Sequence, residues 1–98
     1  MLRQFEYRFS AAKNSLLQAA RGISFEDAIF ALENGGLLDI VDNDLKHYPA
    51  KHVMVLWIKN YAWLVPFFID ENDGALVLKT VYPSRKLTKE YTKEPQDD

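Results

Sequence analysis

The fold is decided by residues 53–69, VMVLWIKNYAWLVPFFI, two apolar runs separated by a short polar turn. Each run predicts a β-strand, and their nearly continuous apolar character predicts a sheet that is covered on much of both faces. Lys59 and Asn60 can turn the chain between them, because Asn tolerates a positive φ. Pro66 has no backbone N–H to give to a neighbouring strand, so it predicts an edge strand or a bulge.

Two helices are predicted before this hairpin. The first lies between Ser10, its N-cap, and Gly22, which ends it in the left-handed conformation. The second begins after Ser24, where Asp27 can complete a capping box, and ends at Asn34-Gly35-Gly36. Its apolar residues recur with the spacing of a core-facing helix, at Phe25, Ala28, Ile29 and Leu32.

The rest of the chain completes an α+β pattern. Residues 70–74 predict a turn, and residues 75–82 predict a third strand. Residues 37–41 predict a further short strand or merely extended chain, and residues 88–93 predict a short terminal turn of helix. The expected fold is α+β, with two N-terminal helices packed on an antiparallel sheet of three to four strands.

The composition is that of one globular domain. The chain has 98 residues, of which 48% are hydrophobic and 27% are charged. No apolar run approaches the ~20 residues of a membrane-spanning helix, and residues 1–6 lack the apolar region of a secretory signal, so we expect a cytoplasmic protein. The absence of Cys excludes disulfides and thiolate metal sites. We predict one domain over residues 1–93 and a disordered acidic tail over residues 94–98.

Charge is distributed unevenly, although the net charge is only −2. Residues 21–45 carry a net charge of −5, whereas residues 79–93 carry +4. This asymmetry suggests two surfaces with different partners. The basic part begins as KTVYPSRK, residues 79–86, which combines cations with hydroxyl groups at the end of the predicted third strand. Cations held there can stabilise a phosphate or another anion. The alternative is that this segment is an ordinary solvated polar surface, which has the same composition.

Several short segments together suggest a family. They are FEY at residues 5–7, AKN at 12–14, RGISFEDA at 21–28, PSRK at 83–86 and KEY at 89–91. In this order they resemble the BrnT-like toxins of bacterial type II toxin–antitoxin pairs, a branch of the RelE/ParE-like superfamily. The resemblance implies a RelE-like endoribonuclease that cuts mRNA and inhibits translation. It also implies a small antitoxin, often a ribbon-helix-helix DNA-binding protein, in a complex that represses its own operon.

RNA cleavage of this kind needs no metal or other cofactor, because the 2′-hydroxyl attacks the adjacent phosphorus and the 5′-oxygen leaves. The protein must help to deprotonate the nucleophile, stabilise the phosphorane and protonate the leaving group. Arg85 is the first candidate for phosphate stabilisation, since its guanidinium can hold two oxygens. Lys86 and Lys79 are candidates for a second cation. His47 is a candidate for acid–base catalysis near neutral pH, and Tyr82 for orienting the base or moving a proton.

The candidates for RNA contact are Lys89, Lys51 and Trp57. The indole of Trp57 can stack on a base, although a Trp on so apolar a strand is more often a core residue. His47 can equally be a surface residue, and His52 is the alternative histidine. Lys79 can equally protect a strand edge from aggregation. No spacing motif makes a metal site of the two histidines, and we assign no metal.

The expected partners are mRNA and a cognate antitoxin, with no membrane. The antitoxin is expected to dock a helix or a strand on an exposed sheet edge in a hetero-oligomer, and a homodimer through the aromatic-rich strands is the alternative assembly. The acidic middle of the chain keeps a second function open, a non-catalytic RelE-like interaction protein that binds an antitoxin or operator complex. An antitoxin-like role is least favoured, because the sequence has no DNA-binding signature and no long disordered arm.

Overall fold

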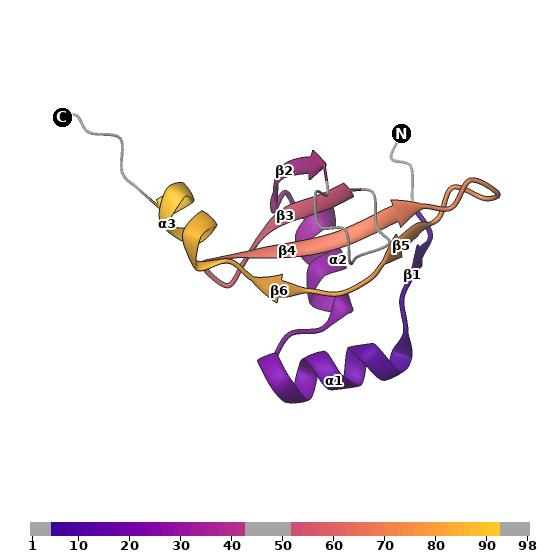
Figure 1. The fold of residues 1–98 in the computed structure, drawn as a ribbon, viewed down its shortest axis with the longest axis horizontal. Coiled ribbons are helices and arrows are strands. Elements are labelled where there is room, and N and C mark those ends of the chain that lie inside the picture. Colours follow the sequence, from indigo (N-terminus) through magenta and orange to yellow (C-terminus); the bar gives the residue numbers. More distant parts are fainter. Residues whose placement is uncertain (1–4, 43–51, 93–98) are drawn as a thin grey trace.

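The computed structural model describes residues 5–42 and 52–92, which form three helices and a six-stranded sheet (Figure 1). The helices are α1 (Ala11–Arg21), α2 (Phe25–Glu33) and α3 (Arg85–Thr92). The strands are β1 (Tyr7–Arg8), β2 (Leu37–Asp42), β3 (His52–Ile58), β4 (Tyr61–Ile69), β5 (Leu76–Leu78) and β6 (Tyr82–Pro83). None of the three helices is both long enough and apolar enough to cross a membrane. The predicted acidic tail, residues 94–98, lies outside the described residues.

The α+β class is confirmed, but the sheet is larger than predicted and the helices are not all N-terminal. The strand order is β1-β5-β4-β3-β2, and β6 pairs with β4 beyond the end of β5. β1 runs parallel to β5, so the sheet is mixed. The sequence did not reveal β1, because two residues are too few to show a period. The predicted third strand is divided into β5 and β6, and the last helix begins at Arg85 rather than at residue 88.

The ends of α1 and α2 confirm the predicted capping residues. Ser10 Oγ accepts a hydrogen bond from the Lys13 N–H, and Gly22 ends α1 with a φ of 66°. Ser24 and Asp27 form a reciprocal capping box, in which each side chain accepts from the backbone N–H of the other at 3.0 Å. These local contacts fix where the two helices begin and turn, so α2 can follow α1 after only three residues.

Replacing Ser24 by alanine is expected to lower the free energy of unfolding by about 1–2 kcal/mol, because the buried end of α2 loses an acceptor. Urea denaturation followed by circular dichroism measures the loss. Ser10→Ala is the matched control, since the exposed Ser10 caps α1 without a reciprocal bond from the third helical residue. An equal loss in both variants would show that burial of the Ser24 hydroxyl adds nothing to the stability that the cap provides.

The main core lies between α1, α2 and one face of the sheet. Leu17 comes from α1, Phe25 and Ala28 come from α2, and all are buried. The sheet side of this core consists of Met54, Leu56, Ile58, Val65, Phe67, Leu76 and Leu78. The other face of β3 carries Val53 and Val55, which are also buried. The continuous apolar runs therefore correspond to strands that are covered on both faces, as predicted.

β3 and β4 form the predicted hairpin, with positive φ at both Lys59 and Asn60. Pro66 lies in the central strand β4, in register with Val53, so it does not mark an edge. The predicted bulge lies on its other side, where residues 65–66 of β4 face the three residues 79–81 between β5 and β6. The Pro66 carbonyl accepts from the Lys79 N–H at 2.9 Å. In an antiparallel ladder the N–H and C=O of one residue point to the same side. The missing N–H therefore faces residues 79–81, where β5 has ended and β6 has not begun.

Candidate functional site

The basic helix α3 is fixed at one end of the sheet, next to the start of β4 (Figure 1). Ser84 donates its N–H to the Ala62 carbonyl at 2.9 Å, and its Oγ accepts from the Leu87 N–H at 3.1 Å. Thr88 Oγ1 accepts the Ala62 N–H at 2.8 Å and donates to the Ser84 carbonyl at 2.7 Å. Both backbone groups of Ala62 on that side of β4 are thus satisfied, and the first turn of α3 is held against the sheet.

Three cations project from this helix. The side chains of Arg85, Lys86 and Lys89 are exposed, and within residues 5–42 and 52–92 none of them has an ion pair or a side-chain hydrogen bond. The first turn of α3 has two cations and no acid, although the helix dipole favours acids there. This arrangement does not stabilise the helix. It becomes favourable when an anion binds, because the cations and the N–H groups at the start of α3 then all attract that anion.

Three further predicted residues lie on the sheet face that points away from α1 and α2. Tyr82 is opposite Leu64, and Trp57 is opposite Ala62, so both share the face of Val55 rather than that of the main core. Lys79 lies on this face too, with its Nζ 5.7 Å from the centre of the Phe68 ring. Trp57 and Lys79 are only partly exposed. The structure thus places a lysine, a tyrosine and a tryptophan on one face of the sheet.

The register along β4 shows which of these residues lie near one another. Ser84 bonds to Ala62, whereas Lys79 bonds to Pro66, four residues further along β4. At the rise of a strand this separates the two backbones by roughly 13 Å. Trp57, opposite Ala62, lies at the same end of the sheet as α3. Arg85, Lys86 and Lys89 therefore form one group with Trp57 nearby, and Lys79 lies further along the sheet.

Two predicted residues, His47 and Lys51, lie outside the described residues. The alternative histidine, His52, starts β3, with its Nδ1 3.7 Å from Asp42 Oδ1 and its ring 5.8 Å from that of Phe67. Its register opposite Phe67 places it at the other end of β4 from Ala62, away from α3. Among the residues that the structure describes, no group of three or more His, Asp or Glu side chains is placed to hold a metal ion.

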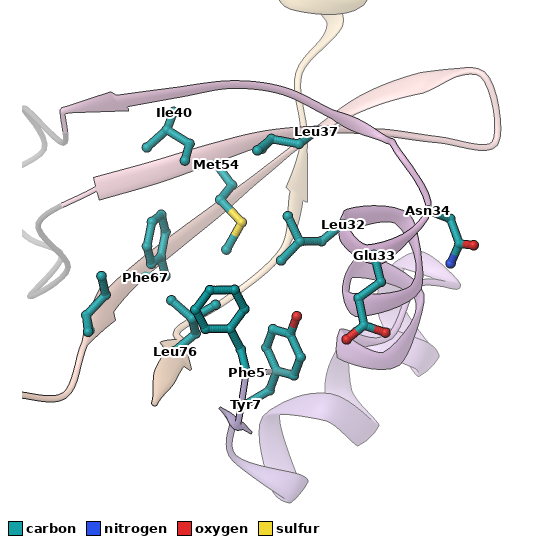
Figure 2. A pocket seen from close by; sticks show the side chains of 11 residues that line it. Phe5, Tyr7, Leu32, Glu33, Asn34, Leu37, Ile40, Met54, Phe67 and Leu76 are labelled. Atoms are coloured by element: carbon teal, nitrogen blue, oxygen red, sulfur yellow. The ribbon is translucent and has the colours of Figure 1, made fainter. Parts of the chain in front are cut away.

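An apolar groove of about 650 Å³, which the sequence did not reveal, opens on the helix-bearing face of the sheet (Figure 2). Its walls come from the segment before β1, from the end of α2 and from β2 to β5. Phe5, Ile40 and Ile69 line it and are each about half exposed. Met54 and Phe67 form its buried floor. The groove exists because the short helix α2 covers only part of this face, and no sequence pattern shows where a helix leaves a sheet uncovered.

Tyr7 and Glu33 form the polar end of this groove (Figure 2). Burial, followed by a hydrogen bond to Glu33 and the charge of that carboxylate, raises the pKa of Tyr7 from 10 to about 12. The fold thus favours the protonated phenol. The resulting stabilisation is present below pH ~10 and is lost as the pH rises through the raised pKa.

A titration of tyrosine absorbance at alkaline pH checks this assignment. Tyr7 is expected to contribute a component with a pKa of about 12. Tyr7→Phe should remove that component, and Glu33→Gln should move it toward the ordinary value, because the carboxylate charge is lost. A Tyr7→Phe protein that still shows this component would assign it to another tyrosine.

Comparison of this chain with protein-family models finds no match, and comparison with curated proteins finds none either. Function is therefore inferred from the residues and contacts described above. Two features carry that inference, the cationic start of α3 and the apolar groove. Only the first was visible in the sequence, as the basic segment that follows the third predicted strand.

Proposed function

We propose that this chain is a BrnT-like toxin of a type II toxin–antitoxin pair, a metal-independent endoribonuclease that cleaves mRNA and inhibits translation. The observation that carries the proposal is the exposed, unpaired cationic group of Arg85 and Lys86 at the start of α3, within the described part of the chain. The resemblance of RGISFEDA (residues 21–28) and PSRK (residues 83–86) to the toxin family supports the same function. The partners of such a protein are mRNA and a cognate antitoxin.

In this proposal Arg85 contacts the scissile phosphate. Its guanidinium can donate to two non-bridging oxygens, and the N–H groups at the start of α3 add to the positive potential. Lys86 and Lys89 neutralise neighbouring phosphates, and Trp57, at the same end of the sheet, stacks on a base. Lys79 is too far along β4 to share that phosphate, so we assign it to a neighbouring part of the RNA backbone.

The test uses the purified full chain and a defined mRNA, with and without EDTA. We expect internal cuts that leave 2′,3′-cyclic phosphate and 5′-hydroxyl ends, since these are the products of attack by the 2′-hydroxyl. EDTA should not change the rate. The reaction is repeated with ribosomes, because the toxin can require them. Intact mRNA under both conditions would overturn the nuclease proposal.

The groove favours a second candidate, a non-catalytic RelE-like protein that binds an antitoxin or operator complex. Exposed apolar side chains gathered around one cavity are typical of a protein-binding surface. Expression of the chain alone distinguishes the two functions. An active toxin should arrest growth, and Arg85→Ala should relieve the arrest, whereas a binding protein should leave growth unchanged in both cases.

A further inference from the structure

The chain that leads into α3 contains a bulge that the sheet pairs incompletely. Residues 79–81, between β5 and β6, face only residues 65–66 of β4. Pro66 has no N–H to donate to this segment. Thr80 and Val81 are nevertheless buried, with 4% and 0% of their surface exposed. Their backbone groups therefore need partners within the protein.

The carbonyl of Val81 points out of the sheet at its edge. Ser84 donates its N–H to Ala62, so Tyr82, two residues earlier, also directs its backbone groups toward β4. The Val81 carbonyl belongs to the same trans peptide as the Tyr82 N–H and therefore points the opposite way. In the described part of the chain no strand lies beyond β6, and β1 pairs with β5 only at its first two residues. The sheet thus supplies no donor for this carbonyl.

Arg21, 60 residues away in the chain, supplies that donor. It is the last residue of α1, and its Nη1 donates to the Val81 carbonyl at 2.6 Å. Figure 1 shows α1 below β6, with its last turn on the side of α3. Within residues 5–42 and 52–92 Arg21 forms no ion pair, so this carbonyl is the partner that the structure gives to the guanidinium. A charged donor makes a stronger hydrogen bond than a neutral one.

The helix that carries Arg21 is itself fixed. Gly22, in the left-handed conformation, ends α1 directly after it. Asn14 joins α1 to α2, because its Oδ1 accepts the Phe25 N–H at 2.7 Å and its Nδ2 donates to Glu26 at 2.8 Å. The guanidinium therefore starts from a defined point on a rigid element. It favours the conformation of the bulge that brings the carbonyl to this point.

The position of the bulge decides the structure that follows it. A bulge displaced by one residue would slip β6 against β4 and turn Tyr82 to the opposite face of the sheet. Ser84 would no longer lie opposite Ala62, so α3 would lose the hydrogen bonds that hold its first turn. The chain from Val81 to Arg85 spans at most about 14 Å. A change in the bulge therefore moves Arg85 directly.

We propose that Arg21 is a positioning residue for Arg85. Its bond to Val81 fixes the bulge, the bulge fixes the register of β6, and this register places the start of α3. Arg21 acts through the backbone and does not contact RNA. That Arg85 then meets a phosphate rests on the proposed function, whereas the control of the bulge by Arg21 does not.

Amide hydrogen exchange, followed by NMR without RNA, tests the control of the bulge. Arg21→Gln keeps a good helix former, but its side chain ends too early to reach Val81. The amides of Tyr82 and Ser84 are expected to exchange roughly tenfold faster in this variant, because a buried acceptor loses its donor. The amides of β3 should exchange at their normal rate. Arg21→Lys keeps a charged donor and should restore slow exchange, and Lys13→Gln, which removes the same charge from α1, is the matched control.

Single-turnover cleavage of a defined mRNA tests the connection to Arg85. Arg21→Gln should slow the chemical step roughly tenfold and leave RNA affinity nearly unchanged, because a displaced guanidinium still binds but is misaligned. In a protein that already carries Arg85→Ala, the same substitution should slow cleavage no further, since no guanidinium is left to position. Arg21→Lys should cleave at close to the normal rate, and so should Lys13→Gln.

Other results overturn the proposal. Normal exchange at Tyr82 and Ser84 in Arg21→Gln would show that the bulge holds without Arg21. Faster exchange throughout the domain, or loss of the fold, would make Arg21 a general stability residue. Weaker RNA binding with a shallower salt dependence would mean that Arg21 contacts RNA itself. Equal slowing with and without the Arg85 side chain would show that Arg21 does not act through it.

The two measurements also separate this proposal from the nuclease. Faster exchange at Tyr82 in Arg21→Gln, together with no mRNA cleavage by the unchanged protein, would retain the control of the bulge and reject the nuclease. Cleavage by the unchanged protein, together with normal exchange in Arg21→Gln, would retain the nuclease and reject the positioning role.

Discussion

Arg85→Ala is expected to lower the rate of mRNA cleavage by roughly 100- to 1,000-fold, the usual effect of removing one preorganised donor to a transition-state anion. The side chain is exposed and has no partner in the described part of the chain, so its loss should leave the fold intact. The effect should appear in single-turnover cleavage of a defined mRNA. Circular dichroism and the thermal midpoint should be those of the unchanged protein.

Two further variants separate a catalytic role from a general charge effect. Arg85→Lys keeps the charge and loses the two-pronged guanidinium, so its rate should stay well below that of the unchanged protein. Lys13→Ala removes one positive charge from α1, away from α3, and should cleave at nearly the normal rate. If Arg85→Ala and Lys13→Ala slow cleavage equally, then Arg85 contributes only to the overall charge and does not contact the scissile phosphate.

Phe25→Ala is expected to have the largest effect on stability, about 3–5 kcal/mol, because it leaves a cavity in the core. Phe25 has no exposed surface, and its ring stacks on that of Phe9 with 4.8 Å between centroids. Its backbone N–H donates to Asn14 Oδ1, so the residue also joins the start of α2 to α1. A domain is stable by only about 5–15 kcal/mol. The variant should therefore unfold at much lower urea concentration.

The control for this prediction lies on the same helix. Phe30 is 69% exposed, and Phe30→Ala should change the free energy of unfolding by less than about 0.5 kcal/mol. Urea denaturation of both variants gives the comparison, provided that the slope against urea stays the same. A similar loss in both would mean that the core does not centre on Phe25, contrary to its burial.

The parts of this protein that depend on neighbouring residues could be predicted from the sequence. The cap at Ser24, the left-handed Gly22 and the turn at Lys59 and Asn60 all appear where the sequence predicted them. Their energies come from hydrogen bonds and steric limits between residues that are close in the sequence. A short stretch of sequence therefore contains all the residues that decide them. The basic segment after the third predicted strand was visible for the same reason. The sequence did not show that Ser84 and Thr88 would hold this segment against Ala62.

Contacts between distant segments decided the rest. The two-residue strand β1 exists only because β5 lies beside it, and Pro66 fits a central strand only because its neighbour is interrupted at residues 79–81. The groove follows from the area of sheet that α2 leaves uncovered, and the distance between Lys79 and α3 follows from the register on β4. The sequence by itself determined the local elements and their charges. Only the tertiary structure decided which faces meet and which remain exposed, because burial and register are properties of pairs of segments far apart in the chain.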